Sequence, residues 1–153
     1  MTPKSMILSA DAFVMAVAPA FATDHKNVSS HLDEIVTSAK KTQLEAREIS
    51  NLLKVKTPDY DRVRTKMQLL TEHAADVNRL VAEFEASNPS LSSSQQAEFN
   101  RLKDIAKLVD VFVTNKNNLL ASSDLNRKLL RAKADGIAKR AEMVQECAIR
   151  IRS

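Results

Sequence analysis

Glycine is nearly missing from this chain of 153 residues, and its scarcity is the first constraint on the fold. The chain contains 1 glycine and 4 prolines, whereas average usage would give roughly 11 and 8. Sheets, hairpins and phosphate-binding loops need glycine for positive φ angles and for close backbone approach. The composition therefore excludes a Rossmann domain, a P-loop and most β architectures, and it predicts long helices joined by few turns.

Cysteine is equally scarce, and the histidines form no metal-binding motif. Cys147 is the single cysteine, so the chain can form no internal disulfide, no C-x-x-C-H haem attachment and no paired-cysteine zinc site. None of the 3 histidines follows a glutamate by three residues, which excludes the Glu-x-x-His motif of di-iron bundles. We therefore predict no metal, no cofactor and no enzymatic activity.

The N-terminal segment is typical of a secretory signal peptide. Lys4 precedes the uncharged apolar run of residues 12–22, and Pro19 stands just before the small-x-small sequence that ends at Ala22. This run is too short to span a membrane, and no later segment approaches 18 apolar residues. We expect cleavage after Ala22, a periplasmic or secreted location, and a single mature domain of residues 23–153. The alternative is an intracellular chain whose first 22 residues form a docking helix.

The rest of the chain predicts four helices, at about 28–54, 58–87, 92–121 and 123–152. Helix caps are expected at Thr57-Pro58, at Ser92 with Gln95, and at 122–124, while Asn88-Pro89 ends the second helix. Inside each segment the apolar residues recur at alternating spacings of four and three, which is the pattern of helices packed near 20°.

Matched lengths and short connections favour an all-α, antiparallel, up-down-up-down four-helix bundle with coiled-coil-like helices. The alternative architecture is an extended coiled-coil hairpin pair that completes its core by dimerising. Pairs such as Leu52/Leu53 and Leu69/Leu70 make the stripes two residues wide per turn. This width suits a closed bundle better than a two-stranded seam.

His31 and Cys147 are the only candidates for chemistry. In an antiparallel bundle we expect residues of the first and fourth helices to lie at equal height when their numbers add up to about 178, as these two do. A thiol beside an imidazole is the start of a reactive pair or of half a metal site. The sequence supplies no third orienting group, so we interpret Cys147 as a small semi-buried hydrophobe and His31 as a solvated residue.

Cations gather at the end that carries the first and third helix connections. The candidate residues for binding an anionic partner are Arg62, Arg64, Lys66, Lys116, Arg127, Lys128, Arg131 and Lys133. Lys54 and Lys56 add to them, and only Asp59, Asp61 and Asp124 oppose them in this part of the sequence. Lys116 stands at a core-seam position, where it pairs with an aspartate of the second helix or lines a polar pocket.

This basic end indicates function better than any motif does. The anionic partners that suit it are a lipid headgroup, a glycan or an acidic protein. The shortage of stacking aromatics argues against nucleic acid. The leading hypothesis is an exported, non-enzymatic helical bundle that acts as a binding, adaptor or chaperone-like protein. The alternative is an intracellular coiled-coil interaction or scaffold subunit that binds partner helices.

Overall fold

A computed structural model of the chain describes residues 27–116 and 127–153. These residues contain four helices and no strand, which confirms the predicted all-helical class. The helices are α1 (Val28–Leu52), α2 (Tyr60–Ala86), α3 (Ser93–Lys116) and α4 (Arg127–Arg152). The predicted signal peptide at 1–22 and the predicted cap at 122–124 lie outside the described residues.

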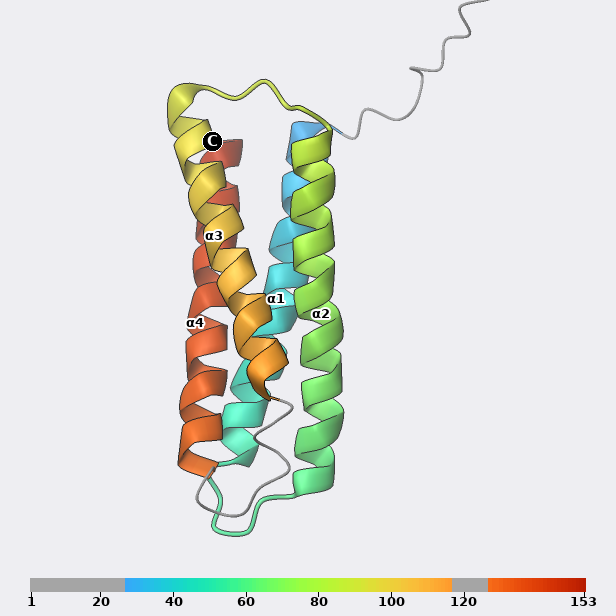
Figure 1. Ribbon diagram of the computed structural model, residues 1–153, viewed down its shortest axis with the longest axis vertical. Coiled ribbons are helices and arrows are strands. Elements are labelled where there is room, and N and C mark those ends of the chain that lie inside the picture. Colours follow the sequence, from blue (N-terminus) through green and yellow to red (C-terminus); the bar gives the residue numbers. More distant parts are fainter. Residues whose placement is uncertain (1–26, 117–126) are drawn as a thin grey trace, which may run out of the picture.

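The four helices lie side by side, and each runs opposite to the one before it (Figure 1). α1 contacts α2 and α4, and α3 contacts the same two helices, while neither diagonal pair is in contact within the described residues. The contact between α1 and α4 is the most extensive and that between α2 and α3 the least. The bundle is therefore closed through its first and last helices.

The helix ends follow local hydrogen bonding. The cap predicted at Thr57 is wrong, because α2 begins two residues later and Asp59 caps it by accepting from the Arg62 backbone N–H at 3.0 Å. Ser92 and Gln95 form the predicted capping box: the Ser92 N–H donates to Gln95 Oε1 at 2.9 Å, and the Gln95 N–H to Ser92 Oγ at 3.3 Å. Beyond the end of α2, Asn88 takes a φ of 49°, the left-handed conformation that closes many helices.

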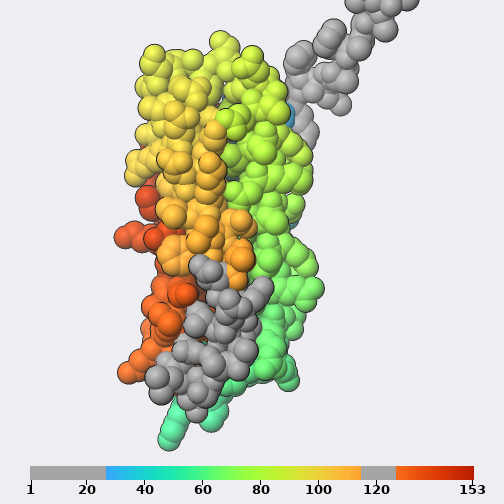
Figure 2. Space-filling view, viewed as in Figure 1, coloured from blue at the N-terminus to red at the C-terminus, as the bar shows by residue number. Residues whose placement is uncertain are grey.

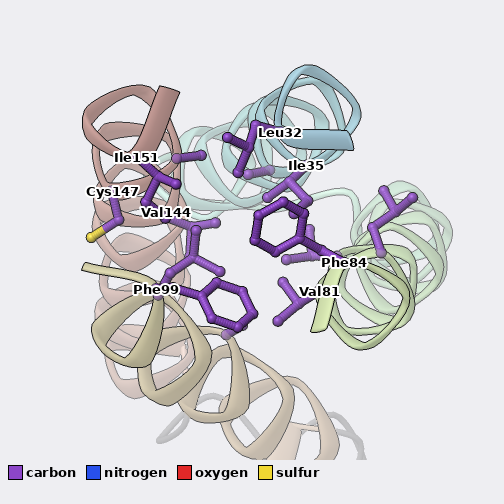
Figure 3. Close-up of a cluster of buried hydrophobic side chains, with 14 of the residues drawn as sticks. Leu32, Ile35, Val81, Phe84, Phe99, Val144, Cys147 and Ile151 are labelled. Carbon is purple, nitrogen blue, oxygen red and sulfur yellow. The ribbon is translucent and has the colours of Figure 1, made fainter. Parts of the chain in front are cut away.

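Apolar side chains from all four helices fill the axis of the bundle in two clusters, one toward each end. In the cluster nearer the C-terminus, Phe84 and Phe99 meet edge to face with ring centroids 5.0 Å apart (Figure 3). The predicted stripe positions in the described residues are buried, except Val28, Tyr60 and Phe112, which are half-buried. The heptad interpretation of the sequence is therefore confirmed.

Polar groups enter the core of the described bundle only from α1. The buried polar residues are Ser38, Thr42, Gln43 and Ser50. Thr42 Oγ1 donates to the Ser38 carbonyl at 2.9 Å, and Gln145 Nε2 of α4 donates to Gln43 Oε1 at 2.9 Å. Because a buried amide without a partner is costly, this amide pair favours one register of α1 against α4.

The core assignment predicts which truncations cost stability. Leu70 is 0% exposed and Val144 is 1% exposed, whereas Leu44 is 54% exposed. Leu70→Ala and Val144→Ala should each lower the free energy of unfolding, by about 2–4 kcal/mol for the leucine and less for the smaller valine. Leu44→Ala should cost below about 0.5 kcal/mol because it leaves no cavity. Chemical denaturation of the three variants measures this, and equal losses at all three sites would contradict the assigned helix faces.

Candidate functional site

We use the name basic pole for the end of the bundle formed by the connection 53–59 and the first turns of α2 and α4. The predicted residues it contains are Arg62, Arg64 and Lys66 on α2, and Arg127, Lys128, Arg131 and Lys133 on α4. The antiparallel arrangement thus brings together cations about 60 residues apart in sequence. Lys116 is the last residue of α3, and its side chain lies outside the described part of the structure.

Acidic residues of α1 neutralise the α2 side of the basic pole. Lys66 Nζ lies 3.1 Å from Glu45 Oε2 and 2.8 Å from Glu48 Oε2, and Arg62 Nη2 lies 2.9 Å from Glu48 Oε1. Lys66 is largely enclosed, with 22% of its side chain exposed. Sequence reasoning missed these two glutamates, because it counted acids near the connections and not on the facing turns of α1.

The ion pairs also shift the pKa values of Glu48 and Lys66. The hydrogen bond from Lys66 is the largest cause that lowers the pKa of Glu48, with Arg62 acting in the same direction. Reciprocally, the hydrogen bonds to Glu48 and Glu45 raise the pKa of Lys66. Glu48 and Lys66 are therefore held charged and paired with each other at neutral pH.

Arg127 serves the fold of the basic pole itself. Its Nη1 atom donates to the carbonyl oxygens of Val55 at 3.1 Å and of Lys56 at 3.0 Å. One guanidinium therefore ties the connection after α1 to the first residue of α4, across 71 residues of sequence. On α2, Arg64 is held by Asp61 of its own helix at 2.8 Å.

The cations that remain lie on the connection and on α4. Lys56, Lys128 and Arg131 are exposed and Lys133 is half-buried, and none of them forms an ion pair with a described residue. No acidic residue stands in the first turn of α4. The positive end of the α4 dipole therefore adds to their charge, and no carboxylate of the first turn offsets it. Part of the predicted set is thus engaged, and part is open to solvent.

No hydrogen bond joins His31 and Cys147 in the structure. The side chains that meet across α1 and α4 have residue numbers that add up to 185, 188 and 189, in the pairs Asp33–Arg152, Gln43–Gln145 and Arg47–Glu142. Side chains tilt toward the N-terminus of their helix, so residues at equal height in antiparallel helices diverge. His31 instead lies against Phe84 of α2, with ring centroids 6.2 Å apart.

Cys147 faces α3 and not α1. Its sulfur points away from the centre of the core cluster (Figure 3) and accepts from Arg150 Nη2 at 3.6 Å. Burial, reinforced by the Glu98 carboxylate, raises the pKa of the Cys147 thiol. The neutral thiol, 0% exposed, therefore has little of the thiolate character and access that reactive cysteines need.

Glu98 completes this small cluster between α3 and α4. Desolvation raises the pKa of its carboxyl, but the hydrogen bonds from Arg150 and Cys147 outweigh that effect and lower the pKa overall. The Arg150 Nε atom lies 3.2 Å from Glu98 Oε2. Within residues 27–116 and 127–153, no three His, Cys, Asp or Glu side chains are grouped so that they could hold a metal ion.

A shallow groove of about 360 Å³ runs between α1 and α2, toward the end opposite the basic pole. Its charged lining residues are Asp33, Glu34, Lys41, Asp76 and Arg79. Arg79 is held by Asp76 at 3.2 Å and by Glu83 at 2.7 Å, and Asp33 pairs with Arg152. Both signs of charge are present and largely paired, so the groove presents no strong electrostatic preference.

The Glu48 ion pairs predict an acid-sensitive fold. Because the pKa of Glu48 is lowered on folding, its contribution to stability is present above its ordinary pKa of 4.5 and is lost as the pH falls through the lowered value. Glu48→Gln should lower the free energy of unfolding at pH 7 by up to about 1 kcal/mol. It should also flatten the dependence of stability on pH below pH 5.

Denaturant unfolding at several pH values between 7 and 3 tests this, with Glu72→Gln as the control. Glu72 is exposed and forms no ion pair with a described residue. Parallel pH profiles for the wild type and Glu48→Gln would contradict the assigned role of Glu48.

None of the described helices is long and apolar enough to cross a membrane. Comparison of the chain with known protein families, with curated proteins and with solved structures gives no match. The arrangement of its own residues is therefore the basis on which its function is argued.

Proposed function

We propose that this protein is an exported, non-enzymatic helical bundle that binds an anionic partner at its basic pole. The observation that carries the proposal is a group of cations at the pole that form no ion pair with a described residue, among them Lys56, Lys128, Arg131 and Lys133. They lie at one end of a rigid bundle, where their fields add. An adaptor or chaperone-like role follows from such a surface, because it attracts and holds a partner without altering it chemically.

The start of α4 adds to this attraction. Lys128 and Arg131 lie in its first turns, where the helix dipole is positive and cations reduce helix stability. An external anion placed there would relieve that repulsion and could also interact with the backbone N–H groups of the first turn. Binding would therefore offset an unfavourable local arrangement, which is a physical reason for these residues to stand at this position.

Charge reversal at the pole tests the proposal. In the triple variant Lys56→Glu, Lys128→Glu and Arg131→Glu, retention on immobilised heparin should fall to the level of an uncharged matrix. The wild type should be retained at low salt and should elute as the ionic strength approaches the physiological range, because these contacts are screened. Stability should change little, since carboxylates are favourable in the first turn of a helix.

The matched control reverses Lys40, Lys107 and Lys139, three exposed lysines on the sides of α1, α3 and α4 that form no ion pair with a described residue. Its net charge equals that of the pole variant. Equal loss of retention in both variants would mean that net charge alone matters. A wild type that binds no polyanion even at low salt would overturn the proposal.

The alternative function is an intracellular coiled-coil interaction or scaffold subunit. One observation favours it: Leu108 and Val111 of α3 are 46% and 53% exposed and lie three residues apart on one face. That spacing is typical of a helix that packs against a partner helix. This reading places binding on the side of the bundle, with the basic pole as an ordinary solvated surface.

The mature N-terminus distinguishes the two functions. Export with cleavage after Ala22 predicts that the protein purified from its source begins at Thr23, shortened by 22 residues. Intact-mass spectrometry of that material measures the difference directly. A chain that begins at Met1 or Thr2 would contradict cleavage and would favour the intracellular alternative.

A further inference from the structure

Two large apolar side chains are exposed at the same pole as the cations that form no ion pair with a described residue. Val55, in the connection after α1, is 52% exposed, and Leu129, in the first turn of α4, is 46% exposed. Each is adjacent in sequence to a lysine, Val55 to Lys56 and Leu129 to Lys128. Folding therefore leaves at this end a surface that is both basic and apolar.

Arg127 holds these two sites together. Because its guanidinium donates to the carbonyls of Val55 and Lys56, the connection is fixed against the start of the helix that carries Leu129. The connection projects beyond the ends of the helices, at the lower tip of the molecule in the view of Figure 2. A flat surface that approaches the bundle end-on would meet Val55 and its neighbouring lysine early.

We propose that the basic pole docks on the surface of an anionic lipid bilayer, with Val55 and Leu129 entering the headgroup region and Lys56, Lys128 and Arg131 against lipid phosphates. This inference rests on the proposed function and specifies its partner. A glycan or an acidic protein segment would satisfy the cations, but a soluble polyanion offers no apolar phase for the two side chains. The surface of an anionic bilayer suits both kinds of side chain. Its negative surface potential attracts the cations, and its interfacial region takes up the apolar side chains from water.

Ion pairing on the α2 side of the pole is consistent with this orientation. Arg62 and Lys66 are held by Glu48, whereas Lys56 and Lys128, which form no ion pair with a described residue, are adjacent in sequence to the exposed apolar side chains. Leu130, the next residue after Leu129, is 3% exposed and packs into the core. The backbone beneath Leu129 is thereby fixed, and exposing this side chain to a bilayer requires no rearrangement of the helix.

Binding to vesicles of phosphatidylcholine, alone or with phosphatidylglycerol, tests the proposal with the full chain. Wild-type protein should bind only the vesicles that contain phosphatidylglycerol. Each of Val55→Ser and Leu129→Ser should weaken that binding by roughly tenfold, since each removes a partly buried apolar contact. Both variants should keep wild-type retention on heparin, because the cations are unchanged.

The control variants are Leu44→Ser on the side of α1 and Ile149→Ser near the opposite end. Their side chains are 54% and 46% exposed, which matches Val55 and Leu129. Both should bind anionic vesicles as the wild type does. The apolar run at residues 12–22 is the same in all variants, so a difference in vesicle binding between the pole and control variants cannot come from it.

A fluorescence readout reports insertion independently of affinity. The chain contains no tryptophan, so Val55→Trp introduces a single one at the pole and Ile149→Trp a single one at the other end. Anionic vesicles should shift the emission of the first variant to shorter wavelength and leave that of the second unchanged.

The outcomes separate this inference from the function on which it rests. Heparin retention with no vesicle binding, or equal vesicle binding by the pole and control variants with no shift at position 55, would overturn docking on a bilayer and leave a soluble anionic partner. Failure to bind either heparin or anionic vesicles would overturn the proposed function as well.

Discussion

Burial of four continuous apolar stripes is the constraint on which the rest of the structure depends. The helices are 24–27 residues long, and isolated helices gain little stability in water because most helical stability comes from tertiary packing. With a single cysteine the chain has no internal disulfide to assist. Stability therefore comes from side-chain packing along the axis of the bundle. The fold places few demands on the charges of the surface residues.

Electrostatics then decides which surface cations are available. A count of charges along the sequence treats every lysine and arginine of the basic pole alike, but folding brings α1 against α2 and commits Lys66 and Arg62 to glutamates. The connection and the first turns of α4 receive no such acids from the described residues. Fewer residues of the pole therefore carry a positive charge that no described acid neutralises. Two of them, Lys56 and Lys128, are adjacent in sequence to exposed Val55 and Leu129.

The sequence predicts the helical fold and the buried faces well because both follow from a simple period. Positions such as Leu70, Ile137 and Val144 recur at heptad spacing and are buried as expected. The cap of α2 lies at Asp59 and not at Thr57, because the Asp59 carboxylate accepts from the backbone N–H of Arg62, three residues on. Periodicity carries no information about such local hydrogen bonding.

The candidate site was harder to predict for a related reason. Equal height in two antiparallel helices does not bring side chains together, because each tilts toward its own N-terminus, and so His31 and Cys147 contact other neighbours. Likewise, the glutamates that pair with Lys66 come from a different helix, so they are found only after the helices are placed against each other. Predicting contacts between helices requires the register of one helix against the other. The apolar stripe of a single helix does not determine that register.

The extensive contact between α1 and α4 has a consequence for the order of folding. Its pairs join residues 102 and 119 positions apart, and the ribosome synthesises α4 after the other three helices. Until then α1 lacks its principal neighbour, so the emerging chain cannot complete its core, and contacts of such long sequence separation slow folding. Core formation is thereby postponed until α4 has been synthesised, so the first three helices remain without a complete core for that interval.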